Sequence, residues 1–256
     1  MLRKKSLGQH FLSSTHYLSL IADTAKIKEG EQILEIGPGE GTLTRELLSR
    51  GARVVAIEKD RRLIPLLQET FQQEIAEKKL SLKEGDVLEE EILLKGSYKL
   101  VANIPYYITG AILEKFLSAP LQPTNMVLLV QKEVAERIAR EKKESILSLS
   151  VKAYGTPHYI KTVPAGAFSP PPQVDSAVLA IENISRNNFL SVAHEEKFFA
   201  LIHAGFAQKR KLLKRNLESV LGKNSGTLLM RAGIPENARA EDVPLEQWLT
   251  LVQLSL

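Results

Sequence analysis

The stretch ILEIGPGEGTLT, residues 33–44, decides the fold of this 256-residue chain. A short apolar run, predicted to be a strand, leads into Gly37, Gly39 and Gly41, and a helix is expected to begin near Thr42. Glycines at such a turn let the backbone bend sharply and approach a ligand beside the helix N-terminus. The spacing G-x-G-x-G differs from the G-x-G-x-x-G of dinucleotide enzymes, and a tight structural turn would also explain it.

Strand-like and helix-like segments alternate from residue 31 onward. Short apolar runs predict strands at QILEIG, RVVAIE, LSLKEGD, YKLVAN and TNMVLLVQ. Helical patterns lie between and after them, over residues 42–50, 60–78, 109–118, 131–141 and 145–154. The alternation predicts an α/β fold, with helices on both faces of a mostly parallel sheet.

The end of the chain has a different pattern. Two strand-like runs, HYIKTV and SAVLAIE, follow one another without a helix and predict an antiparallel pair at the end of the sheet. Beyond them the pattern is wholly helical, with Phe198, Ile202 and Phe206 at helical spacing. We therefore predict a Rossmann-like domain over residues 1–182 and a small all-helical domain over 183–256.

Composition excludes several classes of function. The longest apolar runs are of strand length, so no membrane span is predicted, and the N-terminus lacks the apolar segment of a secretory signal. We therefore expect a cytoplasmic protein. The absence of cysteine excludes disulfides, thiolate metal sites and any cysteine nucleophile, including one for methylation at a pyrimidine ring carbon. The five histidines lack ligand-like spacing, and we predict no metal site.

Basic residues gather in two places, although the net charge is only +4. The clusters consist of Arg3, Lys4 and Lys5 near the N-terminus and of Lys209, Arg210, Lys211, Lys214 and Arg215 in the segment QKRKLLKR. Either cluster alone would be compatible with an ordinary solvated surface. The presence of one basic cluster in each half of the chain favours a nucleic-acid partner, and we predict that both clusters bind RNA.

Acidic residues end the two predicted strands that follow the glycine turn. Glu58 closes VVAIE, where a carboxylate can accept hydrogen bonds from ribose hydroxyls, and Asp86 in EGDVL is placed to accept from the edge of adenine. No lysine follows the glycines as in a P-loop, which disfavours a triphosphate. A nucleoside without phosphate fits best, and we predict S-adenosylmethionine, held by Gly37, Gly39, Glu58 and Asp86.

The next strand ends in VANIPYYITG, residues 101–110, instead of the usual turn residues. The exocyclic amine of adenine is a poor nucleophile because its lone pair is delocalised into the ring. Hydrogen bonds from its two N–H groups to the Asn103 side-chain oxygen and to a backbone carbonyl would free that lone pair. Pro105 stiffens the loop, and Tyr106 offers a face for an unstacked base. Tyr107 is expected to belong to the core.

The late loop GAFSPPPQVDS supplies a second aromatic candidate. Phe168 precedes three prolines and would clamp the base opposite Tyr106, although a buried hydrophobic anchor is the alternative interpretation.

Together these motifs resemble the KsgA family of small-subunit ribosomal RNA adenine N6,N6-dimethyltransferases, almost from end to end. The resemblance is carried by KSLGQHFL, LEIGPGEGTLT, VVAIEKD, EGDVL, NIPYYIT, QKEVAERI, FSPPPQVDS, FAQKRKLLKRNL and RAEDVPLEQW. It implies a class I methyltransferase fold and a helical domain that helps to hold the RNA. The implied reaction transfers four methyl groups from S-adenosylmethionine, two to each of two adjacent adenosines near the 3′ end of the small-subunit RNA.

The resemblance also assigns residues by position. His10 and Leu12 would line the cofactor site together with Gly37, Glu58, Asp86 and Asn103. The target-adenine site would consist of Asn103, the carbonyl near Ile104, Tyr106 and Phe168. Two departures are visible: His10 stands where the family often has Asn, and REKKESILSLSV replaces a longer, Gly-containing segment. We expect a monomer that acts on RNA within a ribosomal particle or an assembly intermediate.

Three other functions remain open on the sequence. An Erm-type methyltransferase of large-subunit RNA shares the NIPYY motif, although FSPPPQVDS and the block Phe206–Leu217 favour the KsgA family. A mainly non-catalytic role in ribosome assembly, or transcription in organellar relatives, is a different class of function, against which the intact motif residues argue. DNA adenine methylation is compatible with the motif chemistry alone.

Overall fold

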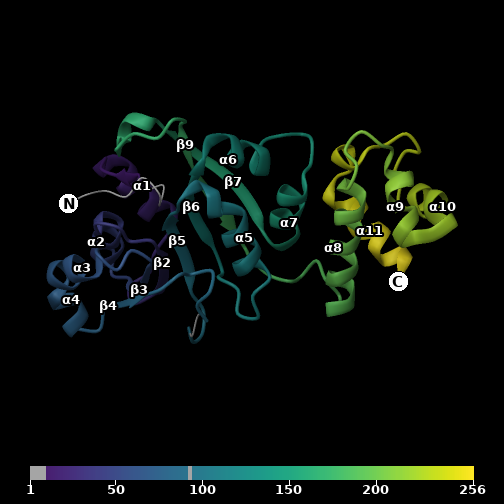
Figure 1. Cartoon of the computed structure of the whole chain (residues 1–256). Coiled ribbons are helices and arrows are strands. Elements are labelled where there is room, and N and C mark those ends of the chain that lie inside the picture. The colour runs from purple at the N-terminus through teal and green to yellow at the C-terminus, as the bar shows by residue number, and fades with distance from the viewer. Residues whose placement is uncertain (1–9, 92–93) are drawn as a thin grey trace. The chain divides into compact units, whose positions relative to one another are not determined.

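Parallel strands form a sheet whose carboxyl ends meet at one edge. In the computed structural model, which describes residues 10–91 and 94–256, seven strands lie in the order β4-β3-β2-β5-β6-β9-β7 (Figure 1). They are β2 (Gln32–Ile36), β3 (Arg53–Glu58), β4 (Leu80–Glu84), β5 (Lys99–Asn103), β6 (Met126–Gln131), β7 (Thr156–Val163) and β9 (Ser176–Glu182). The pairs from β4 to β6 are parallel, and β9 is antiparallel to β6. The predicted mostly parallel α/β sheet is confirmed.

Helices connect these strands as the alternating pattern predicts. The first six are α1 (Thr15–Thr24), α2 (Thr42–Ser49), α3 (Ile64–Thr70), α4 (Gln72–Ala76), α5 (Thr109–Leu117) and α6 (Lys132–Ala139). The helix expected over 60–78 is divided, because Phe71 leaves the helical conformation with φ −116°. None of the described helices is both long and apolar enough to cross a membrane.

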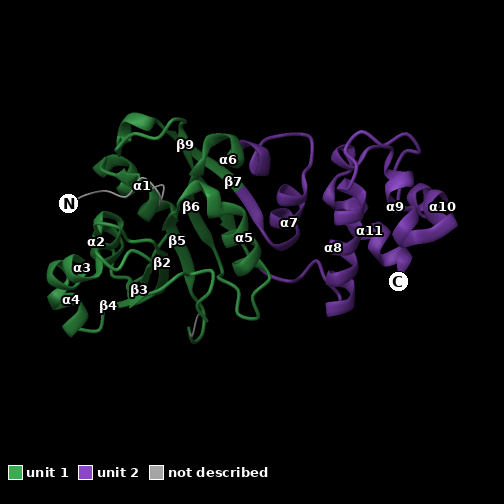
Figure 2. Ribbon diagram, viewed as in Figure 1, with its two compact units in different colours: residues 1–135, 158–184 green, residues 136–157, 185–256 purple. Residues whose placement is uncertain are grey.

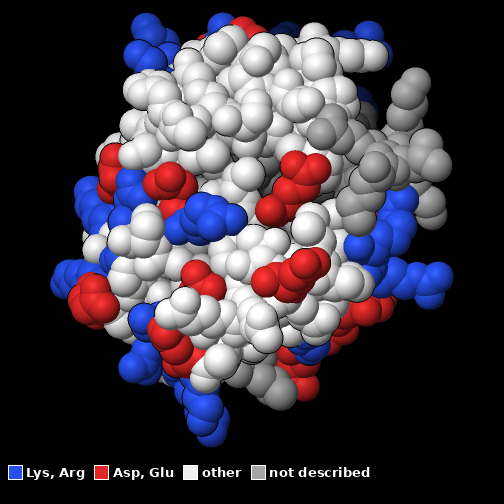
Figure 3. Space-filling model, turned by 90° about the vertical axis from the view of Figure 1, so that its left-hand side faces the viewer, with Lys and Arg blue, Asp and Glu red and all other residues white. Residues whose placement is uncertain are grey.

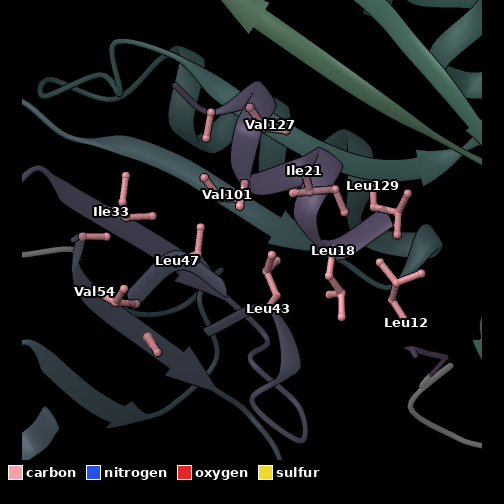
Figure 4. Packing of buried hydrophobic residues seen from close by; sticks show 14 of the residues in the cluster. Leu12, Leu18, Ile21, Ile33, Leu43, Leu47, Val54, Val101, Val127 and Leu129 are labelled. Atoms are coloured by element: carbon pink, nitrogen blue, oxygen red, sulfur yellow. The ribbon is translucent and has the colours of Figure 1, made fainter. Parts of the chain in front are cut away.

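Side chains from the first two helices pack on the sheet and fix its position relative to the glycine turn. Figure 4 shows Leu18 and Ile21 of α1 and Leu43 and Leu47 of α2 pointing toward strand residues that include Val101. Residues Ile33 to Ile36 of β2 are all buried, so this strand is covered on both faces. Burial of both faces leaves the strand ends as the open edge of the sheet.

The chain divides into two compact units (Figure 2). The first contains residues 1–135 and 158–184, and the second contains 136–157 and 185–256. The longer stretch of the second unit begins at residue 185, close to the boundary expected after residue 182. The unit also includes residues 136–157, which the sequence analysis placed in the first domain.

Helices make up the second unit, as predicted beyond residue 183. They are α7 (Ile146–Tyr154), α8 (Val192–Phe206), α9 (Leu213–Leu221), α10 (Ser225–Arg231) and α11 (Leu245–Ser255). Leu149 and Ala153 of α7 join the same buried cluster as Phe198 and Trp248, which explains why α7 belongs to this unit. The unusual segment REKKESILSLSV forms the turn before α7 and its first turns, with Ser145 as N-cap.

A carboxyl group is buried inside the first unit. Glu35 lies in β2 with 1% of its surface exposed, and its Oε2 accepts a hydrogen bond of 2.7 Å from the Thr44 hydroxyl. Its Oε1 has no hydrogen-bond partner among the described residues. Burial raises the pKa of Glu35 from 4.5 to about 8. The side chain is thus protonated in the folded protein at neutral pH.

This burial predicts a pH-dependent stability. Between about pH 4.5 and pH 8 the folded protein holds a proton on Glu35 that the unfolded chain releases, so the free energy of unfolding should fall as the pH rises through this range. Glu35→Gln should remove this part of the pH dependence. Urea unfolding at pH 5, 7 and 9 measures it, and parallel curves for the two proteins would contradict the assignment.

Candidate active site

The glycine turn forms a cradle at the end of β2. Gly37 and Gly39 adopt left-handed backbone conformations, with φ of +66° and +61°, which favour glycine. A Cβ at Gly37 would point into open space, whereas one at Gly39 would lie 2.8 Å from the ring of Phe11. The backbone therefore leaves room for a ligand at Gly37 and is closely covered at Gly39.

Glu58 connects the tip of β3 to this cradle. It is 5% exposed, and its Oε2 accepts a hydrogen bond of 3.0 Å from the backbone N–H of Gly39. Its Oε1 accepts one of 2.8 Å from the N–H of Asp60. Burial raises the pKa of Glu58, and these backbone donors oppose the rise. Each carboxylate oxygen retains a lone pair, so the side chain can still accept from a ribose hydroxyl.

Asp86 provides a second acceptor, just after β4. Its Oδ2 pairs with the Lys59 ammonium at 2.5 Å, and its Oδ1 accepts a hydrogen bond of 2.9 Å from the N–H of Leu88. The hydrogen bond from Lys59 lowers the pKa of Asp86. The carboxylate is thus ionised at neutral pH and held at the strand tip, next to Glu58 on the neighbouring strand.

Asn103 ends β5 with its amide oriented by the backbone. Its Nδ2 donates a hydrogen bond of 3.2 Å to the carbonyl of His10. Because a carbonyl can only accept, this contact assigns the amide nitrogen to the His10 side. No described residue donates to Asn103 Oδ1, so this oxygen remains an acceptor. Ile104 behind it is buried, and Pro105 follows with φ −58°.

The two tyrosines after Pro105 differ in their surroundings. Tyr106 is half-buried, its ring stacks on that of His10 at a centroid distance of 6.2 Å, and its hydroxyl lies 2.7 Å from that of Ser176. Tyr107 is 68% exposed, so the expectation that it belongs to the core is wrong. It stands at the rim because consecutive residues of the 3₁₀ turn Tyr106–Ile108 point in different directions.

Strand β1 (Phe11–Leu12) brings the N-terminal motif to the site. It pairs antiparallel with β8 (Phe168–Ser169), with Leu12 opposite Phe168. Phe11, which the sequence analysis did not single out, lies against Gly39. Periodicity gives no signal for it, because a two-residue strand is too short to show a period, and its place in the motif KSLGQHFL is the signal that could have found it.

Phe168 lies elsewhere than the clamp hypothesis requires. It is 4% exposed and belongs to the main hydrophobic cluster of the first unit. It is not part of the crevice lining in this structure. This position corresponds to the alternative interpretation, a hydrophobic anchor for the Pro-rich loop, and a role in clamping the base stays a prediction.

Apart from Phe168, the residues predicted for the cofactor and target-adenine sites meet in one crevice at the carboxyl ends of β2 to β5. It encloses about 1060 Å³ of empty space, including solvent at its mouth. Its lining contains His10, Leu12, Gly37, Gly39, Glu58, Asp86, Asn103, Ile104, Pro105 and Tyr106. The crevice lies where β2 has β3 on one side and β5 on the other, the switch point at which open α/β sheets bind ligands. The described residues contain no group of His, Asp and Glu that could hold a metal ion.

The second basic cluster lies on the helical unit. Lys209, Arg210 and Lys211 are exposed in the turn between α8 and α9, and Arg215 is exposed in α9. Lys214 pairs with Glu236 at 3.0 Å. The first cluster, Arg3, Lys4 and Lys5, lies outside the described residues.

A match to known proteins covers almost the whole chain. The family model described as ribosomal RNA adenine dimethylase matches residues 2–255. The chain belongs to this family. The resemblance found in the sequence is confirmed, and S-adenosylmethionine is the methyl donor of this ribosomal RNA adenine dimethylase.

Relatives in sequence and structure agree with this membership. Ribosomal RNA small subunit methyltransferase A of Dehalococcoides mccartyi is 43% identical, over 97% of this chain and 87% of that protein. The protein of the same name in Caulobacter vibrioides is 38% identical, over 99% and 97%. The crystal structures of the 23S rRNA methyltransferase ErmE and of a dimethyladenosine transferase from Plasmodium falciparum both give a TM-score of 0.78. ErmE is 27% identical, over 96% of this chain and 99% of its own. The Plasmodium falciparum protein is 26% identical, over 94% of this chain and 96% of its own. The class I methyltransferase fold is confirmed.

The crevice fits the methyl donor. The open space at Gly37 leaves the backbone accessible, Glu58 suits a ribose, and Asp86 is an ionised acceptor for the amine of an adenine. No lysine directly follows the glycines as in a P-loop, in keeping with an uncharged nucleoside portion. We propose that Gly37, Glu58 and Asp86 hold the donor's adenosyl portion.

Gly37→Ala should weaken S-adenosylmethionine binding by about tenfold or more, because the added methyl group would fill the cradle. Gly30→Ala is a matched control. Gly30 has φ +71° and open space around it, but lies outside the crevice. Both variants should lose about 1–2 kcal/mol of stability, and only Gly37→Ala should lose affinity in isothermal titration calorimetry. Equal affinities in the two variants would contradict the cradle.

Proposed function

We propose that this protein methylates the exocyclic N6 of two adjacent adenosines near the 3′ end of small-subunit ribosomal RNA, giving N6,N6-dimethyladenosine. It acts as a monomer in the cytoplasm, on RNA within a ribosomal particle or an assembly intermediate. The orientation of Asn103 carries the proposal: the His10 carbonyl holds its Nδ2, so that Oδ1 is left to accept from an amine. The small-subunit relatives, at 38–43% identity, support the choice of RNA.

The residues of this chain prepare the amine for attack. Asn103 Oδ1 accepts one N–H bond and the carbonyl near Ile104 accepts the other, which favours a pyramidal nitrogen with an available lone pair. Tyr106 presents its ring to the base, and Pro105 limits movement of the loop. S-adenosylmethionine supplies an activated methyl group on a sulfonium. Positioning therefore dominates catalysis, and no strong general base is required.

The second candidate is methylation of large-subunit RNA. It is favoured by the similarity to ErmE, whose TM-score equals that of the dimethyladenosine transferase. The fold is common to both kinds of neighbour, so only the identity of the RNA separates the two functions.

The test is incubation with tritiated S-adenosylmethionine and, separately, unmethylated small-subunit particles, naked large-subunit RNA and duplex DNA. The labelled nucleosides are then identified by chromatography. Dimethyladenosine from small-subunit particles alone is the expected result. Label in large-subunit RNA would favour the second candidate, and label in DNA would overturn the RNA assignment.

Asn103→Ala should slow methyl transfer by about 100-fold or more, because it removes the oriented acceptor. Binding of S-adenosylmethionine should remain nearly unchanged in calorimetry. Asn187→Ala, at an exposed position of the second unit, is the control and should turn over as the wild type does. Wild-type turnover in Asn103→Ala would refute the assigned role.

The RNA-binding prediction concerns the basic turn. Figure 3 shows acidic and basic side chains interspersed on one face of the molecule, which gives that face no block of a single sign. A local cluster of basic residues, in contrast, provides several phosphate contacts together.

Replacing Lys209, Arg210 and Lys211 by Ala should weaken RNA binding and reduce the slope of log K against log salt by about 2 to 3. Replacing three exposed lysines outside the clusters, Lys28, Lys78 and Lys161, removes the same charge as a control. Filter binding at several salt concentrations measures both variants. Equal slopes in the two would count against a specific role for the turn.

A further inference from the structure

A hydrogen bond joins two motifs that lie far apart in the chain. The hydroxyl of Tyr106, in the NIPYY turn, lies 2.7 Å from the hydroxyl of Ser176, which begins β9 at the end of the FSPPPQVDS loop. Ser176 is fully buried, and the sequence analysis assigned it no role. The contact therefore fixes a crevice residue to a rigid part of the first unit.

The backbone around Ser176 is held on several sides. Ser176 pairs in register with Gln131 of β6. The N–H of Lys132 donates to the carbonyl of Asp175 at 3.0 Å, and the carboxylate of Asp175 accepts a hydrogen bond of 3.0 Å from the N–H of Ala165. Ser176 Oγ is thus a fixed point, whereas Tyr106 stands at the start of the short 3₁₀ turn that leads into α5.

The ring of Tyr106 is defined at two points. His10 stacks on the ring at an interplanar angle of 20°, and Nδ1 of that histidine donates to the carbonyl of Pro170 at 2.9 Å. Pro170 and Ser176 belong to the same late loop, so this loop fixes both the ring that stacks on Tyr106 and the hydroxyl of Tyr106 itself. A phenol held at its far end cannot swing about χ1 without breaking the hydrogen bond.

We propose that Ser176 is a positioning residue for methyl transfer, whose hydroxyl holds the Tyr106 ring in the orientation that receives the target adenine. The proposal rests on the function proposed above. Its effect is on the reacting geometry, because a base stacked at the wrong angle places its amine away from Asn103 Oδ1. Ser176 touches neither the RNA nor the methyl donor in this role.

The test is a double-mutant cycle of Ser176→Ala and Tyr106→Phe, each of which removes the same hydrogen bond. Either substitution alone should lower kcat by about tenfold, with the dissociation constant of S-adenosylmethionine unchanged. In the Tyr106→Phe background, Ser176→Ala should have no further effect. If the two losses of kcat multiplied in the double variant, the proposal would be overturned, because Ser176 would then act through β9 and not through the Tyr106 hydroxyl.

A second readout does not depend on the natural substrate. The probe is a single-stranded RNA with the fluorescent base 2-aminopurine at the target position. Its fluorescence should be quenched when the base stacks on Tyr106, and both single variants should weaken this quenching equally. Wild-type quenching in Ser176→Ala would overturn the proposal even if no methyl transfer were observed. Should Ser176→Ala fail to fold, Tyr106→Phe still removes the bond, and wild-type kcat and quenching in it would overturn the proposal. Failure of the proposed function would appear separately, as absence of label in small-subunit particles with the wild-type protein.

Discussion

The pairing of β1 with β8 is the contact on which the crevice depends. It joins Phe11 to Ser169 and Leu12 to Phe168, and the N–H of Ser13 extends it by donating to the carbonyl of Ala167. These segments lie more than 150 residues apart in the chain. Without this pairing, the parallel sheet would still present its strand tips, but nothing would place a backbone carbonyl opposite Asn103 or an aromatic ring over Gly39. The strands supply the acceptors, and the small antiparallel ladder orients them.

The sequence predicted the parts of the site that follow from strand ends. Gly37, Glu58 and Asn103 each come at the end of a buried apolar strand or directly after it, Asp86 follows the more exposed strand β4, and carboxyl ends of parallel strands meet at one edge. Local patterns therefore sufficed to place these four residues in one crevice. The prediction of two domains also rested on local patterns, and it placed α7 in the first domain because α7 precedes residue 183 in the chain. In the structure, Leu149 and Ala153 pack with the helical unit, and the packing of an apolar face is not visible in the order of elements.

Contacts between distant segments could not be predicted in this way. Phe11 is recognised only by its distance from Gly39, and Ser176 only by its contact with the Tyr106 hydroxyl. Tyr107 was expected in the core, yet the 3₁₀ turn directs it outward. In each case, the geometry of a turn or a two-residue strand decided the outcome, and neither has a period that a sequence can reveal.

Side-chain amides hold backbone segments of both units by the same physical means. In the first unit, Asn103 donates to the carbonyl of His10. In the second, Asn216 is 8% exposed, and its Nδ2 donates to the carbonyls of Gly205 and Gln208, at 2.6 and 3.1 Å. These carbonyls lie at the end of α8, immediately before Lys209, so the amide fixes the backbone that carries the exposed basic residues. Charge attracts a phosphate backbone wherever it lies, but only a fixed turn presents several charges in one arrangement. A crevice for one base suits a ribosomal RNA adenine dimethylase, and the proposed RNA-binding role of the turn requires such a fixed arrangement of charges.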